Sequence, residues 1–421
     1  MCHSTVLAAL VSALLAHLTA AMRPGDSHRS ADEPLALVGA TVLVGPAEEP
    51  VRDGVVLVRD GKIAAVGGKE LLKDLAGART LDCSGLTIVA GFWNSHVHFF
   101  ERKWANAAAI PADELGRELQ DMLTRYGFTS VFDLGSPWEN TRQLRERIES
   151  GEVPGPRIRT TGEGLISPGA APSEQVLNVM GVMKLALPEV ADGVQASEVA
   201  ERLLEQGTDG IKLFAKNATP PSPAFPEGVL EAAVRAAHGP GRPVFVHPGT
   251  GADVLAAARA GVDVIAHTTP RSGPWNETTL AAMKEHGVAL TPTLTLWRYY
   301  QRHDRLTTQE QITATAVGQL RAWLAVGGTV LFGTDLGAVP YDPGEEYRWM
   351  SAAGMDWRQI LASLTTAPAE RFGDSARLGR VAAGLEADLV VLNGDPTRDL
   401  GALSDVRYTL RAGKIIYRAG E

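Results

Sequence analysis

One repeating order of segments constrains the fold of this 421-residue chain more than any other feature. From Leu86 onward, amphipathic segments end near a glycine and are followed by short apolar runs that finish in polar residues. The first such segment, "ADELGRELQDMLTRYG", has Leu115, Leu119 and Met122 at helical spacing and ends at Gly127, a residue typical of helix C-termini. Helices that alternate with strands in this way are typical of a parallel sheet.

Eight apolar runs follow this order between residues 86 and 373, which predicts an α/β fold of the (β/α)8 TIM-barrel class. The runs are "LTIVA", "FTSVFDLG", "RIRTTGEG", "GIKLFAK", "PVFVHPG", "VDVIAHTTP", "VALTPTLTLW" and "TVLFGTDLG". A doubly wound open sheet is the alternative. The barrel accounts better for the polar residues at the carboxyl end of nearly every run, because barrel enzymes build their active sites at that end.

The two ends of the chain differ from this central region. Residues 35–85 contain hairpin-like strand segments with a turn signal at Asp60-Gly61, and residues 374–421 continue in the same style. Both ends also carry a similar strand motif, "RDGKIAAV" in the first and "RAGKIIYR" in the second. We therefore predict that residues 35–85 and 374–421 form one composite β-sandwich domain beside a barrel of residues 86–373.

The N-terminus resembles a secretory signal peptide over residues 1–21. An apolar stretch from Val6 to Leu18 is followed by small residues, although no Lys or Arg precedes it. The stretch is shorter than a typical transmembrane helix, so no stable membrane insertion is expected. Residues 22–34 are predicted to be a flexible lead-in, and the mature protein is expected to be secreted or periplasmic. An uncleaved anchor is the alternative.

Composition excludes some classes of partner and of fold. The net charge of −9 argues against nucleic acid as a partner, because binding of the phosphate backbone needs a basic surface. Apolar residues make up 45% and charged residues 21%, a balance typical of soluble globular proteins. Cleavage of the signal peptide would remove Cys2 and leave Cys83 alone, which excludes a disulfide framework.

Two histidines one residue apart, His96 and His98, end the first apolar run in "GFWNSHVHFF". Alternate residues of a strand point to the same side, so both imidazoles are expected on one face with Cα atoms about 6 to 7 Å apart. That spacing allows both rings to share a metal ion. A pair of hydrogen-bonded core histidines is the alternative.

Further metal-competent side chains end other strands of the predicted barrel. Lys212 lies on the fourth, His247 on the fifth, His267 on the sixth and Asp335 on the eighth. A single buried histidine is more often a hydrogen-bonded core residue than a ligand. Six such side chains at one end of a barrel are hard to explain separately, so together with the histidine pair they predict a metal centre.

These motifs resemble the amidohydrolase superfamily, in the branch similar to imidazolonepropionase and the metal-dependent Xaa-Pro dipeptidases. "VAGFWNSHVH" is similar to the family's first-strand motif, "LTTAPAERFG" to its closing barrel helix and "GRVAAGLEADLVVL" to the strand that rejoins the small β-domain. The resemblance covers nearly the whole chain. Ala90 replaces the usual proline and Asn94 the usual aspartate, and both precede the histidine pair.

The resemblance implies a centre with two divalent metal ions. His96, His98 and Asp335 would hold one ion, His247 and His267 the other, and Lys212 would bridge both as a CO2-derived carbamate. Nearby cations favour the neutral amine, which captures CO2 and becomes an anionic oxygen ligand. A lysine paired with a carboxylate is the alternative. Imidazole and carboxylate ligands make zinc the first expectation, with manganese, iron or cobalt as alternatives.

The function implied is that of a metal-dependent amidohydrolase, which cleaves an amide, peptide or cyclic-imide C–N bond of a small-molecule or dipeptide-like substrate. A metal-bridging hydroxide would attack the carbonyl, and Asp335 would pass its proton to the leaving amine. Trp297, Arg298 and Tyr299, after the seventh strand, are candidates for binding an aromatic or carboxylate group, with packing as the alternative. A metal-dependent esterase or lactonase, and a non-catalytic scaffold protein, are the competing functions. The sequence does not predict an oligomeric state.

Overall fold

A computed structural model describes residues 34–74, 77–171, 181–215, 225, 228–299 and 308–420. The predicted signal peptide and all but the last residue of the predicted lead-in therefore lie outside the described residues. Within the described part of the chain, no helix is both long enough and apolar enough to cross a membrane.

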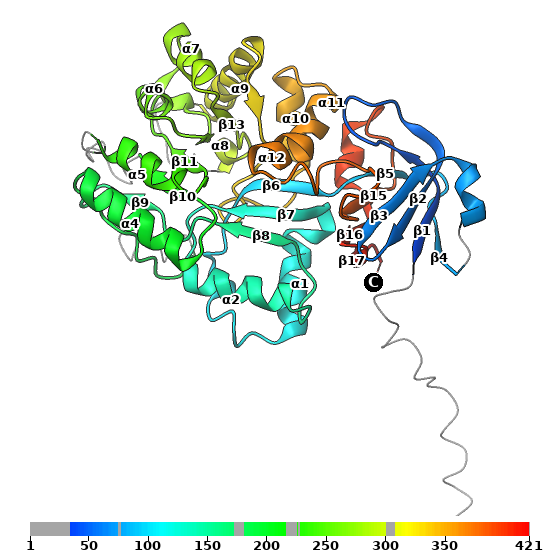
Figure 1. Cartoon of the computed structure of the whole chain (residues 1–421). Coiled ribbons are helices and arrows are strands. Elements are labelled where there is room, and N and C mark those ends of the chain that lie inside the picture. Colours follow the sequence, from blue (N-terminus) through cyan, green and yellow to red (C-terminus); the bar gives the residue numbers. More distant parts are fainter. Residues whose placement is uncertain are drawn as a thin grey trace, which may run out of the picture.

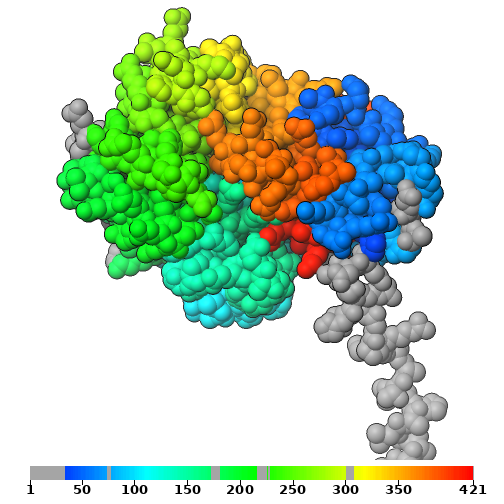
Figure 2. Space-filling view, in the orientation of Figure 1, coloured from blue at the N-terminus to red at the C-terminus, as the bar shows by residue number. Residues whose placement is uncertain are grey.

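Strands from both chain ends build one mixed sheet, in the order β17-β16-β15-β5-β1-β2-β3, with β4 also paired to β1. Its N-terminal strands are β1 (Leu35–Val42), β2 (Val51–Arg59), β3 (Lys62–Gly67), β4 (Arg79–Asp82) and β5 (Thr87–Ala90), and its C-terminal strands are β15 (Leu389–Leu392), β16 (Val406–Arg411) and β17 (Lys414–Arg418). The blue and red strands of Figure 1 belong to this sheet, and the blue N-terminal part packs against the orange and red C-terminal part in Figure 2. A two-layer sandwich stays a prediction.

The similar motifs at the two ends form equivalent two-residue turns. Asp60 and Gly61 both have positive φ, 49° and 72°, and join β2 to β3. Ala412 and Gly413, with φ of 46° and 75°, join β16 to β17 in the same way. Positive φ at both central positions is the requirement of a tight hairpin turn between twisted strands, so the turn predicted at Asp60-Gly61 is confirmed.

The run at residues 86–90 does not lie where the sequence placed it. Its strand, β5, pairs with β1 and β15 of the mixed sheet, and the first strand of the central region is β6 (Phe92–Val97). The chain leaves the mixed sheet and enters the sheet that contains β6 at Gly91. A Cβ atom at this position would lie 2.2 Å from the Thr129 hydroxyl oxygen, so a side chain does not fit there. Because both strands are wholly buried, apolar patterning alone cannot tell them apart.

The central region contains two parallel sheets. One has the order β6-β7-β8 and the other the order β14-β13-β12-β11-β10-β9. The strands are β7 (Phe128–Asp133), β8 (Arg157–Thr160), β9 (Leu165–Ile166), β10 (Ile211–Phe214), β11 (Val244–His247), β12 (Val264–Ala266), β13 (Ala289–Thr291) and β14 (Thr329–Val330). Backbone hydrogen bonds from Ser95 to Phe332 (2.7 Å) and from Asp335 to His96 (2.9 Å) connect β6 with the segment after β14. The α/β prediction is confirmed.

Helices follow the parallel strands and surround them (Figure 1). The α-helices are α1 (Ala112–Met122), α2 (Trp138–Glu149), α4 (Gly193–Gln206), α5 (Val229–His238), α6 (Gly251–Arg259), α7 (Glu277–Glu285), α8 (Leu296–Tyr299), α9 (Gln309–Ala325), α10 (Gly344–Ala352), α11 (Trp357–Leu364) and α12 (Thr366–Arg371). Short 3-10 helices are η1 (Lys69–Asp74), η2 (Arg102–Trp104), η3 (Thr124–Tyr126), η4 (Pro270–Ser272) and η5 (Leu400–Ser404). Helix α1 buries Leu115, Leu119 and Met122, the face predicted from the sequence.

Candidate metal centre

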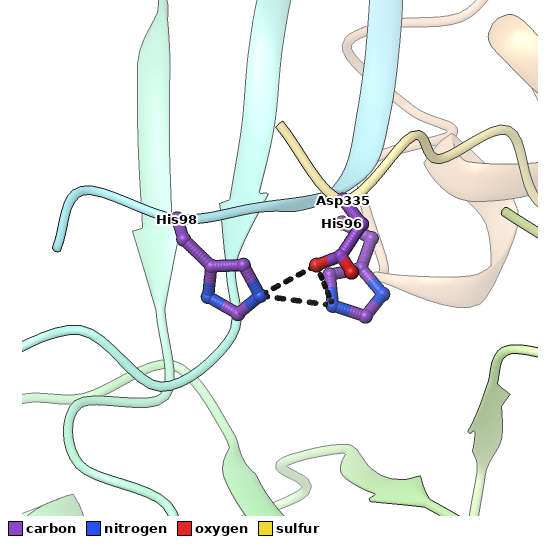
Figure 3. Close-up of side chains that lie close together, drawn as sticks. All are labelled: His96, His98 and Asp335. Carbon is purple, nitrogen blue, oxygen red and sulfur yellow. Dashed lines mark hydrogen bonds and ion pairs between the residues drawn. The ribbon is translucent and has the colours of Figure 1, made fainter. Parts of the chain in front are cut away.

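Three of the predicted ligands converge at the carboxyl end of β6 (Figure 3). His98 Nε2 lies 2.8 Å and His96 Nε2 lies 3.2 Å from Asp335 Oδ1, and the two Nε2 atoms are 3.2 Å apart. All three residues are buried. Neither Nδ1 atom has a hydrogen-bond partner among the described residues, so both rings make their polar contacts through Nε2. Two imidazole nitrogens and one carboxylate oxygen at this spacing suit a single divalent ion.

Close backbone contacts aim Asp335 at the histidines. A Cβ atom on Gly333 would lie 2.9 Å from His96 Cβ, and one on Gly337 would lie 2.9 Å from the His98 carbonyl oxygen. Both positions therefore need glycine. Asp335 itself has a φ of 66°, a conformation that costs a residue with a side chain roughly 1–3 kcal/mol. Strain of this kind is concentrated at functional sites, where the surrounding packing maintains it.

Asn94 ties together the two segments that carry these ligands. Its Nδ2 donates to Thr334 Oγ1 at 2.7 Å, and its Oδ1 accepts from the backbone N–H groups of His96 (3.2 Å) and Thr334 (3.3 Å). The side-chain amide both donates and accepts, so it hydrogen-bonds to β6 and to the segment after β14 from a buried position. The sequence marked Asn94 as a departure from the family pattern but gave no sign of this contact.

The two other predicted histidines extend the cluster. His247 ends β11 and His267 follows β12 directly. The ring centroids of His96 and His267 are 4.6 Å apart, and those of His267 and His247 are 4.5 Å apart. His267 also has a positive φ of 78°. The structure thus brings the four predicted histidines into one continuous group of rings.

Lys212 lies on β10 and is completely buried. Its Nζ has no hydrogen-bond partner among the described residues, so the alternative of a short ion pair at the strand end is not seen there. Burial lowers the pKa of Lys212 to about 7, although the charges of Asp335 and Asp133 act in the opposite direction. A buried amine that is partly neutral at neutral pH has the lone pair that carboxylation by CO2 requires.

The electrostatics of the site keep His96 neutral. Burial lowers the pKa of His96 well below its ordinary value, and the positive charge of Lys212 and of the neighbouring histidines lowers it further. A neutral imidazole offers a lone pair to a metal ion, whereas a protonated one does not. The environment of His96 therefore favours the form that binds metal.

A second buried carboxylate, Asp133, was missed by the sequence reasoning. It ends β7 and accepts hydrogen bonds from the hydroxyls of Ser136 and Thr160, the latter at 2.6 Å. Ser136 Oγ in turn accepts the backbone N–H of Phe99 at 2.7 Å, one residue after His98. Burial raises the pKa of Asp133, and the positive charge of His98 opposes that rise. The signal was present, because the apolar run in "FTSVFDLG" leads directly to Asp133, just as other runs lead to the predicted ligands.

The predicted substrate-binding residues occupy α8. Trp297 is buried, and its Nε1 donates to Thr268 Oγ1 at 2.7 Å, next to His267. Arg298 is 54% exposed and pairs with Glu345, while Tyr299 packs partly buried against the core. The contact of Trp297 is one of packing and support. A direct role for the three residues in substrate binding stays a prediction.

Comparisons with known proteins identify the family of this chain. The model of the amidohydrolase family matches residues 87–417. An uncharacterized protein of Mycobacterium tuberculosis is 27% identical over 377 residues, which are 83% of this chain and 90% of that protein. A 58-residue match, 40% identical, joins 14% of the chain to 15% of an enamidase of Eubacterium barkeri. A prolidase crystallised with N-methylphosphonate-L-proline superposes with a TM-score of 0.73 at 27% identity, over 91% of this chain and 100% of that one. The chain therefore belongs to the amidohydrolase family.

Proposed function

We propose that this protein is a two-metal hydrolase that cleaves an amide or peptide C–N bond in a small, dipeptide-like substrate. Membership of the amidohydrolase family makes it a hydrolase acting on C–N bonds. The observation that carries the finer proposal is the meeting of His96, His98 and Asp335 near a buried Lys212 whose Nζ has no hydrogen-bond partner among the described residues. A core histidine pair explains the first of these features but not the second.

The donors present fit two divalent ions. His96, His98 and Asp335 would hold one ion, His247 and His267 would hold the other, and a carboxylated Lys212 would supply an anionic oxygen ligand to the pair. Two imidazole Nε2 atoms 3.2 Å apart, both beside one carboxylate oxygen, form a cluster of donor atoms that a cation stabilises. Imidazole and carboxylate ligands favour zinc as the metal. The ions would supply Lewis acidity and would lower the pKa of a bound water molecule.

Asp335 is the proposed proton carrier. Its Oδ1 makes the contact with each histidine, and we assign the role of base to Oδ2, so that one carboxylate serves as ligand and as base. Asp335 Oδ2 would accept the proton of the attacking water and then deliver it to the nitrogen of the leaving amine. The backbone of Asp335 is held by the hydrogen bond from its N–H to the His96 carbonyl (2.9 Å), which fixes the carboxylate for both steps.

Phe100 adds an apolar cover to the site. Its ring stacks on the imidazole of His98, with centroids 4.4 Å apart and planes at 21°. Phe100 also packs against Val182, from the segment after β9. An apolar cover excludes water and strengthens the electrostatic interactions beneath it. Phe100 is thus expected to face the substrate side of the ligand cluster.

The proposal also covers the architecture and the location of the protein. We place the site at the carboxyl ends of a closed (β/α)8 barrel, next to a small β-sandwich formed by the two chain ends. Hydrogen bonds at both gaps between the parallel sheets support closure: Ser95 N–H to Phe332 O (2.7 Å) and Asp209 N–H to Thr160 O (2.7 Å). Export, with loss of residues 1–21, is proposed from the sequence alone.

A substrate panel on the metal-loaded protein tests the proposed function. It should contain Xaa-Pro dipeptides, N-acyl amino acids, cyclic imides, lactones and carboxylic esters. The similarity to a prolidase and the short match to an enamidase support the C–N substrates. We expect turnover of at least one C–N substrate that a chelator abolishes. Turnover of lactones or esters alone would favour the esterase alternative, and no metal-dependent turnover of any substrate would favour the scaffold alternative.

A further inference from the structure

Two contacts of Thr293 indicate which ring nitrogen of His267 carries the proton. His267 Nδ1 lies 2.6 Å from Thr293 Oγ1, and the Thr293 hydroxyl donates to the Pro292 carbonyl oxygen at 2.9 Å. A carbonyl has no proton to give, so the contact with Pro292 uses the single hydroxyl proton of Thr293. In that arrangement Thr293 accepts its second hydrogen bond from His267 Nδ1–H. The other nitrogen, Nε2, keeps its lone pair.

Thr293 makes this contact from a strained backbone. Its φ is 44°, a left-handed conformation that is a genuine outlier for a β-branched residue. Thr293 directly follows Pro292 at the end of β13, and its side chain is buried. A conformation of this kind persists only when neighbouring groups over-determine it.

Glu346, on α10, supplies that restraint. Its Oε1 accepts the backbone N–H of Leu294 at 2.8 Å, and its Oε2 accepts that of Thr295 at 2.7 Å. Glu346 is completely buried, so neither oxygen is shared with solvent. Both carboxylate oxygens therefore hold the two residues that follow Thr293, and a helix distant in sequence fixes the turn that contacts His267.

We propose that Thr293 and Glu346 are positioning residues that lock the His267 imidazole in the Nδ1-protonated tautomer and present Nε2 to the second metal ion. This inference rests on the proposed function, because that function makes His267 a ligand. Neither residue touches substrate. Removing the Thr293 hydroxyl takes away the acceptor that the buried Nδ1–H faces, which favours a change in the tautomer or the orientation of the ring.

Thr293→Val and Thr293→Ser separate the hydrogen bond from the packing. Valine keeps the shape of the side chain and removes the hydroxyl, whereas serine keeps the hydroxyl. Thr291→Val is the matched control: Thr291 is buried two residues earlier on β13, and its Oγ1 has no hydrogen-bond partner among the described residues. Glu346→Gln replaces one of the two acceptor oxygens with an N–H donor that faces a backbone N–H.

The first readout is zinc binding to the metal-free proteins, measured by competition with a chelator. We expect Thr293→Val to weaken the second binding step by about 10- to 100-fold, the usual effect of losing the hydrogen-bond partner of a metal-bound histidine. Glu346→Gln should act in the same direction, while Thr293→Ser and Thr291→Val should stay within about threefold of the parent. A Thr293→Val protein that binds the second ion as tightly as the parent overturns the inference.

The second readout does not depend on a second metal ion. Nitrogen-15 shifts of His267 in the metal-free parent, from selectively labelled histidine, should show a protonated Nδ1 and an unprotonated Nε2. Protonation at Nε2 overturns the inference whatever the metal titration gives. A parent that binds only one ion would count against the two-metal function itself, and the His267 shifts would then decide the tautomer alone.

Discussion

Replacing Lys212 with methionine is expected to stabilise the metal-free protein, although it removes a proposed ligand. Methionine has a similar length and no charge to bury. Burial lowers the pKa of Lys212 from its ordinary value of 10.5 to about 7. At about 1.4 kcal/mol for each pKa unit, that difference corresponds to roughly 5 kcal/mol of lost folding stability when the lysine is charged in both states.

The stability that Lys212→Met gains over the parent is expected to depend on pH. Below pH 7 the lysine is protonated in the folded and the unfolded chain, and the whole penalty applies. Between pH 7 and 10.5 the folded chain has released the proton while the unfolded chain keeps it, so the penalty falls as the pH rises. The advantage of Lys212→Met should therefore be largest near pH 6 and should shrink to roughly 2 kcal/mol near pH 9.

Urea denaturation with a chelator present, at pH 6 and at pH 9, measures this difference. Lys414→Met is the matched control, because Lys414 is exposed on β17 and its replacement should change the stability by less than about 0.5 kcal/mol. A Lys212→Met protein that is no more stable than the parent at pH 6 would refute the reasoning. An advantage that does not change between the two pH values would refute it as well.

Four further predictions concern the ligands, the packing and the N-terminus. Asp335→Asn should lower turnover by at least about a hundredfold with the fold intact by circular dichroism, because the amide cannot accept the proton; near-normal turnover would remove Asp335 from the mechanism. Lys212→Ala should lower the metal content to one ion or fewer per chain, and formate or acetate should restore part of the activity, which a lysine that merely forms an ion pair would not allow. Gly333→Ala should weaken metal binding, measured by chelator competition, because the added methyl would lie 2.3 Å from Thr291 Cγ2 and 2.9 Å from His96 Cβ; binding unchanged from the parent would contradict the close packing described here. N-terminal sequencing of the exported protein should begin near residue 22, and a mature chain that starts at Met1 would count against cleavage.

The clustered side chains of the candidate site were predictable from the sequence because they follow two local regularities. Alternation along a strand places His96 and His98 on one face, and parallel strands gather their carboxyl ends at one edge of the fold. His247, His267 and Asp335 could therefore be picked out from their places at the ends of apolar runs. The same reasoning placed β5 wrongly, because a wholly buried strand has the same apolar pattern in the mixed sheet as in a parallel one.

The supporting contacts were not predictable, because each joins residues far apart in the sequence. The bond between Asn94 and Thr334 spans 240 positions, and that between Leu294 and Glu346 spans 52. No local pattern encodes which distant strand or helix lies opposite a given residue. Trp297 is a further example: the structure shows its ring nitrogen donating a hydrogen bond to Thr268, 29 positions earlier, while its predicted role in substrate binding stays a prediction.

Counting metal ions in the purified protein tests the central claim most directly. Inductively coupled plasma mass spectrometry on protein expressed with zinc and dialysed without chelator should find about two divalent ions per chain. The count should fall to about one or fewer when His98, which contacts Asp335 at 2.8 Å, is replaced with alanine. A parent protein that retains no stoichiometric metal under these conditions would contradict the account.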